Sequence, residues 1–262
     1  MTALSPSFLS DTLMILLAVG VLAILLTSLY SIGPTQVGLV RKRLGARLRG
    51  DNPLAFHGEA GYQADLLMPG LRFKLSLVYA VTKHPWVQVP AAQIGVVIAQ
   101  VGQPLPIGAK SAVYKSEFGN FADLKTFIEH GGQKGVQRPV LPPGTLAPVH
   151  PLAFMVITKP QVFGVPVSSE LSALAQKRGQ LTFGAFGLEP KQLEVTRIAP
   201  NPTEGGKVLD MVGIVTTLEG APLPAGDIAS RLGGFRDIEA LEAGPEPDAS
   251  TDARLIETIL GN

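Results

Sequence analysis

The apolar run at residues 13–32 (LMILLAVGVLAILLTSLYSI) is the feature that most limits how this chain can fold. It holds twenty residues without a charge, and at ~1.5 Å per residue a helix of that length matches the ~30 Å hydrocarbon core of a bilayer. No basic residue precedes the run and no small-residue cleavage site follows it, which favours an uncleaved anchor over a signal peptide. We therefore predict a short tail at 1–12 and a transmembrane helix at 13–32.

Basic residues follow this run closely, whereas residues 1–12 contain none. Because cytoplasmic flanks carry an excess of Lys and Arg, the pattern predicts that the rest of the chain lies in the cytoplasm. The same side chains would also attract anionic lipid at the membrane surface, although topology alone is enough to explain them. The cluster consists of Arg41, Lys42, Arg43, Arg47 and Arg49.

Composition narrows the class of protein further. Only 16% of the residues are charged and 46% are hydrophobic, which is typical of a membrane-associated chain. The formal net charge of +1 gives no reason to expect nucleic acid as a partner. The chain has no cysteine, which excludes disulfides, thiol nucleophiles and thiolate metal sites.

Beyond residue 32 the apolar pattern changes to that of strands joined by Gly- and Pro-rich turns. Residues 36–40 (QVGLV) and 93–97 (QIGVV) each follow a proline, and 71–77 (LRFKLSL) alternates as a half-buried strand would. One helix is predicted at 120–132 (NFADLKTFIEHGG), with Asn120 as its N-cap and an apolar face that includes Phe121, Leu124, Phe127 and Ile128.

A strand and its turn occur twice. Residues 95–108 (GVVIAQVGQPLPIG) and 213–226 (GIVTTLEGAPLPAG) are identical at seven of fourteen positions. The helix at 120–132 also has a counterpart in 234–244 (GFRDIEALEAG). We therefore predict an α+β fold in which tandem, strand-rich β–α units follow the transmembrane helix, with a first domain at 33–157 and a related unit at 158–262. Because the second unit stops before the counterpart of 142–157, we expect it to be truncated at its C-terminal end.

In the order of its motifs the chain resembles the stomatin/prohibitin/flotillin (SPFH, or Band 7) family, especially bacterial flotillin-like members. The resemblance rests on TQVGLVRKRLG (35–45), MPGLRFKLSLVYAVTKHPWVQVP (68–90), AQIGVVIAQVGQPLP (92–106) and GVQRPVLPPGTLAPVHPLAFMV (135–156), placed directly after the apolar run. Two features depart from the family pattern: His150-Pro151 stands where Asn-Pro is usual, and no heptad-rich coiled coil lies within the 262 residues.

The resemblance implies a scaffold rather than an enzyme: an SPFH domain that assembles into large rings or cages and organises a membrane microdomain. It further implies a bacterial inner-membrane location, lipid and further copies of the chain as partners, and a small NfeD-type membrane protein as a possible one. Two alternatives stay open. The chain could be an anchored subunit or regulator of a membrane enzyme such as a protease complex, or a monomeric envelope adaptor.

The sequence contains little that indicates catalysis, and we predict no catalytic, cofactor-binding or metal site. The four histidines, His57, His84, His130 and His150, show no ligand spacing, and no phosphate-binding or nucleophile motif occurs. Asp123 is expected to cap or complement a helix. Trp86, the only tryptophan, and Tyr79 are candidates for a membrane or subunit contact, although a position at the edge of the core is the more common one for a residue like Trp86.

Overall fold

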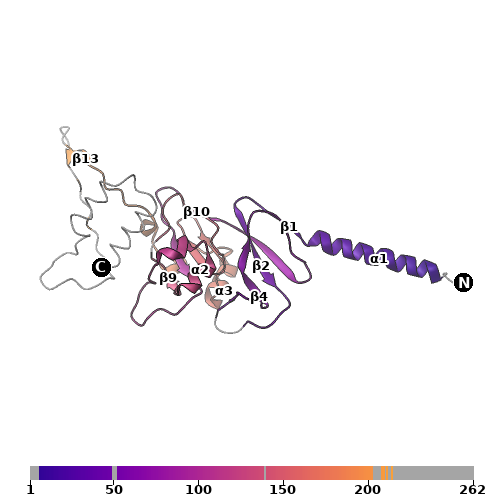
Figure 1. Ribbon diagram of the computed structural model, residues 1–262. Coiled ribbons are helices and arrows are strands. Elements are labelled where there is room, and N and C mark those ends of the chain that lie inside the picture. The colour runs from indigo at the N-terminus through magenta and orange to yellow at the C-terminus, as the bar shows by residue number, and fades with distance from the viewer. Residues whose placement is uncertain are drawn as a thin grey trace.

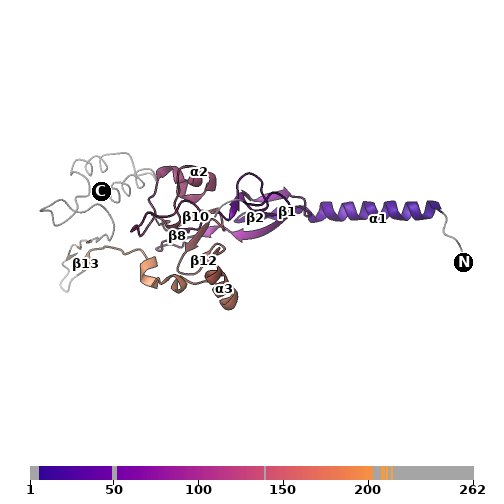
Figure 2. The same ribbon diagram turned by 90° about the horizontal axis from the view of Figure 1, so that it is seen from below.

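The computed structural model describes residues 6–48, 52–138, 140–202, 208–209, 211 and 214. A single helix projects from a body built of two small sheets, as Figures 1 and 2 show. The elements of the first part are α1 (Pro6–Thr27), β1 (Leu29–Ile32), β2 (Gln36–Lys42), β3 (Leu54–Ala55), β4 (Gly61–Leu67), β5 (Gly70–Phe73), β6 (Tyr79–Pro85) and β7 (Val87–Gln88).

The remaining elements build the second sheet and the segments around it. They are β8 (Val96–Ala99), η1 (Ser116–Phe121), α2 (Leu124–Glu129), β9 (Gly135–Val136), β10 (Leu146–Ala147), β11 (Phe154–Ile157), β12 (Val162–Phe163), α3 (Ser169–Arg178), η2 (Phe183–Phe186), η3 (Pro190–Leu193), β13 (Asn201–Pro202) and β14 (Val208–Leu209).

Two four-stranded sheets form the body. The first has the strand order β3-β4-β2-β6 and the second the order β12-β11-β8-β9. Three two-stranded pairs, β1-β5, β7-β10 and β13-β14, complete the pairing. Trp86 lies between β6 of the first sheet and β7 of the pair β7–β10, and the chain enters the second sheet at β8. Buried apolar residues of both sheets belong to one core cluster, so the two sheets share a core.

Aromatic side chains fill the part of this core between the second sheet and α2. The ring of Phe154 on β11 lies 5.0 Å from that of Phe127 on α2 and 5.3 Å from that of Phe121. Tyr114 and Phe118 extend the same cluster with edge-to-face contacts, the geometry that aromatic pairs prefer. The predicted apolar face of the helix is confirmed at Phe121, Leu124 and Phe127, all of which are buried.

The predicted start of that helix was three residues too early. The N-cap is Asp123, whose carboxylate accepts hydrogen bonds from the backbone N–H groups of Lys125 (2.9 Å) and Thr126 (3.3 Å). The residues before it form the 3₁₀ turn η1. Asp123 therefore has the capping role expected of it, and Gly131, at φ +79°, follows the helix end as predicted.

The prediction of a transmembrane helix at 13–32 is wrong, and the predicted fold class is wrong in that part. Helix α1 ends at Thr27, and Leu29–Ile32 form strand β1 instead. Within the described residues, no helix combines the length and the apolar character needed to cross a membrane. The single-pass localisation that rested on this helix loses its support.

The second copy of the internal repeat, residues 213–226 and 234–244, lies outside the described residues except for Ile214. Of the predicted unit 158–262, the described part contributes strand β12 to the second sheet. It also supplies Leu193, which is fully buried. Its backbone carbonyl accepts from Ile94 N–H at 3.0 Å, next to the start of β8.

Candidate functional site

Polar side chains at the end of α1 fix the helix to the body. Ser28 is fully buried; its hydroxyl donates to the Ile24 carbonyl (2.6 Å) and accepts from the backbone N–H of Ser76 (2.9 Å). The Ser28 carbonyl accepts from Lys74 N–H at 2.9 Å, and the Thr27 and Ser76 hydroxyls share a 3.0 Å hydrogen bond. These bonds explain why the apolar run leaves the helix at residue 28 rather than continuing to 32.

The strand pair β1–β5 turns an apolar face away from the protein. Leu29 lies opposite Phe73 and Ser31 opposite Leu71, so these four side chains share one face. Leu29, Leu71 and Phe73 are 45%, 70% and 54% exposed. On the other face Ile32 is buried against the first sheet. The predicted strand at 71–77 is present only as far as Phe73, and the prediction that it is half-buried is wrong, because all four residues of β5 are exposed.

Helix α1 continues this apolar surface. Most of its large apolar side chains are largely exposed, on every side of the helix. They are eight leucine, isoleucine, methionine and valine residues between positions 13 and 22, together with Leu25 and Leu26. Figure 1 shows that α1 contacts the body only at its C-terminal end, beside β1. We call α1 and the outward face of β1–β5 the helix-and-ribbon surface.

Cationic side chains lie beside this surface at the near end of the first sheet. The Arg43 N–H donates to the Val78 carbonyl (2.8 Å), in the turn that also carries Ser76. The Arg41 guanidinium lies 5.7 Å from the centre of the Tyr62 ring, and Lys42 Nζ donates to the Gly58 carbonyl at 2.5 Å. Of the predicted basic cluster, Arg41 and Lys42 end strand β2, and Arg43 follows directly. Arg47 is exposed in the following loop, and Arg49 is outside the described residues.

Tyr79 and Trp86 occupy opposite ends of β6. Tyr79 pairs with Lys42 at the near end, and its ring lies 5.1 Å from Lys74 Nζ, a cation–π contact. Pro85 pairs with Gln36 at the far end, and Trp86 follows it. At ~3.3 Å per residue, the seven residues of β6 hold Trp86 roughly 20 Å from the level of Tyr79. Of the two interface candidates, only Tyr79 is close to the helix-and-ribbon surface.

His150 connects the two sheets from a buried position. It is 1% exposed; its Nε2 lies 3.1 Å from the Gln63 carbonyl on β4, and its Nδ1 accepts from the N–H groups of Leu152 (3.3 Å) and Ala153 (3.1 Å). This geometry requires the neutral tautomer with the proton on Nε2. Burial lowers the pKa of His150 to about 4.

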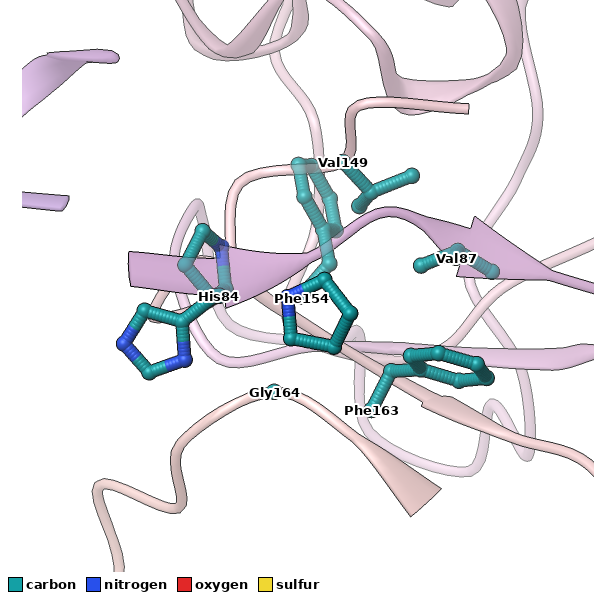
Figure 3. A pocket seen from close by; sticks show the side chains of 8 residues that line it. His84, Val87, Val149, Phe154, Phe163 and Gly164 are labelled. Carbon is teal, nitrogen blue, oxygen red and sulfur yellow. The ribbon is translucent and has the colours of Figure 1, made fainter. Parts of the chain in front are cut away.

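A small cavity separates His84 from the aromatic core. It measures about 20 Å³, room for roughly one water molecule. Figure 3 shows His84, Phe154 and Phe163 around it, with the backbone at Gly164 along its lower side. Partial burial lowers the pKa of His84. With one titratable side chain in its lining, the cavity offers no pair of groups for acid–base chemistry.

A larger groove of about 250 Å³ adjoins this cavity at the junction of the two sheets. No charged side chain lines it. The indole Nε1–H of Trp86 is buried without a hydrogen-bond acceptor among the described residues, a state that costs about 1–3 kcal/mol. Sequence reasoning missed this groove, because its members come from four separate segments of the chain. They are Thr35, Pro85, Trp86, Gln88, Leu146, Gln161 and Phe163.

Titratable groups elsewhere in the described residues do not converge. No three His, Asp or Glu side chains there form a group able to hold a metal ion. His57 pairs with Glu59 at 3.7 Å on the surface, and His130 bonds the Thr126 carbonyl within its own helix. Residues 131–135 (GGQKG) follow α2 as a loop, which matches the prediction of a helix end rather than a phosphate cradle.

Comparisons with known proteins add no relative. No family model matches the chain, and no curated protein or solved structure matches it either. The helix-and-ribbon surface and the Trp86 groove are therefore interpreted from their own chemistry.

Proposed function

We propose that this chain is a self-assembling scaffold of the SPFH type that binds a lipid surface through its helix-and-ribbon surface. The observation that carries the proposal is the continuity of exposed apolar side chains from α1 onto Leu29, Leu71 and Phe73. A helix that is apolar on every side is stable only when lipid or other protein covers it. Contiguous apolar patches of this kind mark interaction sites.

The charges around the patch favour lipid as its cover. Lys74 and Arg43 lie near the end of α1, because Lys74 N–H donates to the Ser28 carbonyl and Arg43 N–H to the Val78 carbonyl in the neighbouring turn. A cation near an anionic membrane contributes about 1 kcal/mol. A surface with an apolar centre and a cationic border is what the boundary between acyl chains and headgroups requires.

Open sheet edges support the scaffold part of the proposal. Strand β6 is seven residues long and pairs only with β2 in the first sheet, and β12 is an edge of the second sheet. Edge strands offer unpaired backbone donors and acceptors to a neighbouring chain. Assembly of lipid-bound copies side by side would organise the membrane beneath them, and by resemblance alone an NfeD-type protein stays a possible partner.

Vesicle flotation tests the lipid-binding part. The full chain is mixed with phosphatidylcholine vesicles, with and without phosphatidylserine, alongside a Leu71→Glu/Phe73→Glu variant. The control, Val113→Glu/Val167→Glu, changes two exposed valines outside the ribbon. We expect the native chain and the control to float, more strongly with phosphatidylserine, and the ribbon variant to lose most binding. Equal flotation of the two variants, or none by the native chain, would contradict the proposal.

Native mass tests the scaffold part. Light scattering after size exclusion in mild detergent should give a particle of many subunits, well above the 27.6 kDa of one chain. A mass equal to that of one chain would contradict the scaffold and would favour an adaptor that acts as a monomer.

A further inference from the structure

We propose that the Trp86 groove binds the loop Pro104–Ile107 of a second copy of this chain, so that copies join head to tail. This inference rests on the proposed self-assembly and names the contact through which it occurs. It combines two features that the fold leaves unexplained: a neutral groove with an unpaired indole N–H, and an exposed apolar loop elsewhere on the body.

The groove suits a short neutral peptide segment. Its volume of about 250 Å³ falls below the ~300–1,000 Å³ typical of small-molecule sites. Trp86, Phe163 and Pro85 supply apolar walls, and Gln88 and Gln161 supply amide groups. Aromatic-lined grooves of this kind recognise proline-containing extended segments. Since the lining carries no charge, it has nothing to attract lipid headgroups or acidic peptides.

The position of the groove also points to protein rather than lipid. Trp86 lies at the end of β6 opposite Tyr79, the end that adjoins Lys42, Arg43 and the base of α1. With α1 and the ribbon on a membrane, the groove lies roughly 20 Å further out along β6. A neighbouring copy on the same membrane can reach it there.

The loop offers the complementary shape. Ile107 is fully exposed, although the base of its loop is well held: Gln103 N–H donates to the Gly132 carbonyl (2.8 Å), and Lys134 N–H donates to the Gln103 carbonyl (2.7 Å). Leu105 packs over Gly135, where an added Cβ would lie 2.9 Å from it. An ordered loop with an exposed apolar tip loses little conformational freedom on binding.

Hydrogen-bonding capacity matches as well. Pro104 and Pro106 contribute carbonyl acceptors without N–H donors, although the Pro106 carbonyl already accepts from Ala109 N–H at 3.1 Å. In the groove, the Trp86 indole N–H is a donor without an acceptor among the described residues. A small rotation of the indole toward a bound loop would give this donor a carbonyl partner.

Loop and groove are different patches on one chain, which makes the contact heterologous. Such contacts form rings when the rotation between copies closes, and open filaments when it does not. The rival occupant is the chain's own segment 221–226 (APLPAG), which repeats the Pro-Leu-Pro motif but has Ala225 at the position of Ile107. The experiments must therefore distinguish the loop of a second copy from the chain's own segment 221–226.

The first experiment uses two variants of the full chain in mild detergent. Ile107→Asp breaks the loop and leaves the groove intact, whereas Leu146→Asp breaks the groove at a half-exposed position and leaves the loop intact. We expect each variant alone to be a monomer and an equal mixture to form dimers, because one intact contact remains. Val113→Asp, an exposed control, should assemble like the native chain. Native-sized particles from both variants would overturn this inference and leave the proposed scaffold standing.

The second experiment uses the fluorescence of Trp86, the only tryptophan. A peptide of residues 102–109 is titrated into the Ile107→Asp variant, whose groove is free of the loop of another copy. We expect a saturable change in emission, with the peptide of residues 220–227 binding about tenfold or more weakly because it lacks the isoleucine. Equal or tighter binding of 220–227 would assign the groove to the chain's own tail. No change with either peptide would overturn the inference, whatever the native mass proves to be.

Discussion

Strands β5 and β11 both carry large apolar side chains, but they lie in opposite environments. All four residues of β11 (Phe154–Ile157) are buried, and all four of β5 (Gly70–Phe73) are exposed. Strand β11 has hydrogen-bonded neighbours on both sides and the aromatic cluster of α2 over one face. Within the part of the chain that the structure describes, strand β5 pairs only with β1. An apolar pattern in the sequence therefore indicates that one face of a strand will be covered. The elements packed beside the strand decide whether the cover is the protein's own core or another molecule.

The largest expected difference comes from making the same substitution, Phe to Ala, in each of the two strands. Phe154→Ala removes a ring that is 1% exposed and leaves a cavity in the shared core, so we expect a loss of about 3–5 kcal/mol of unfolding free energy. Phe73→Ala removes a half-exposed ring outside that core, and we expect a change within about 0.5 kcal/mol. Urea unfolding of the full chain in detergent measures both.

Vesicle flotation is the second measurement for this prediction. Phe73→Ala should bind lipid more weakly than the native chain while its fold stays intact. If Phe73→Ala destabilised the chain as much as Phe154→Ala, the ribbon would belong to the protein core and the contrast between the strands would fail.

The second prediction concerns the buried histidine that joins the sheets. The pKa of His150 is about 4 in the folded chain, because burial disfavours the cation, against ~6.5 when unfolded. Between these values the unfolded chain binds the extra proton, so the stability that His150 confers is complete above pH ~6.5 and falls as pH drops toward 4. The full loss is about 3 kcal/mol. His84 and Asp65 are the nearest charges, with opposite and smaller effects.

A matched pair of variants isolates this effect from the titration of carboxylates. His150→Asn keeps an acceptor for the N–H groups of Leu152 and Ala153 but does not titrate, so its stability should vary less between pH 7 and 4.5 than that of the native chain. His57→Asn, at an exposed position, should keep the native pH dependence. An unchanged slope in His150→Asn would show that His150 is not the group responsible.

The third prediction compares two glycines that both have positive φ. Gly102 has φ +110°, and an added Cβ would lie 2.2 Å from the Gly132 carbonyl oxygen. Gly144 has φ +79° with nothing within 4 Å of that position. Both alanine variants carry backbone strain of about 1 kcal/mol, but only Gly102→Ala adds a clash, so we expect it to cost about 1–3 kcal/mol more. Equal thermal unfolding temperatures would show that the 101–103 turn can shift away from Gly132.

The sequence predicted those structural features that depend on residues close together in the chain, and it missed those that depend on distant residues. Strand β2, the Pro-Gly turn before β5 and the apolar face of α2 follow from short patterns, and each was predicted. The end of α1 was not, because it depends on bonds from Ser28 to residues 48 positions away along the chain. The role of His150 depends on Gln63, 87 positions away. The Trp86 groove draws on residues 35 to 163, beyond the reach of any pattern.

The smallest expected effect tests the most local of these features, the cap of α2. The Thr126 hydroxyl, which donates to the Asp123 carboxylate at 2.8 Å, and two backbone N–H groups hold the pKa of Asp123 below its usual value. Asp123→Ala should therefore cost about 1 kcal/mol above pH ~4, and this difference should shrink as pH falls through the folded pKa and the native carboxylate is protonated. Asp123→Asn keeps an acceptor and should cost only a few tenths of a kcal/mol. A larger loss of unfolding free energy in Asp123→Asn would mean that the charge of Asp123 matters in addition to its capping hydrogen bonds. The ion pair between Lys125 and Asp65, at 2.8 Å, would then depend on that charge, and the effect of the cap would reach β4 as well as α2.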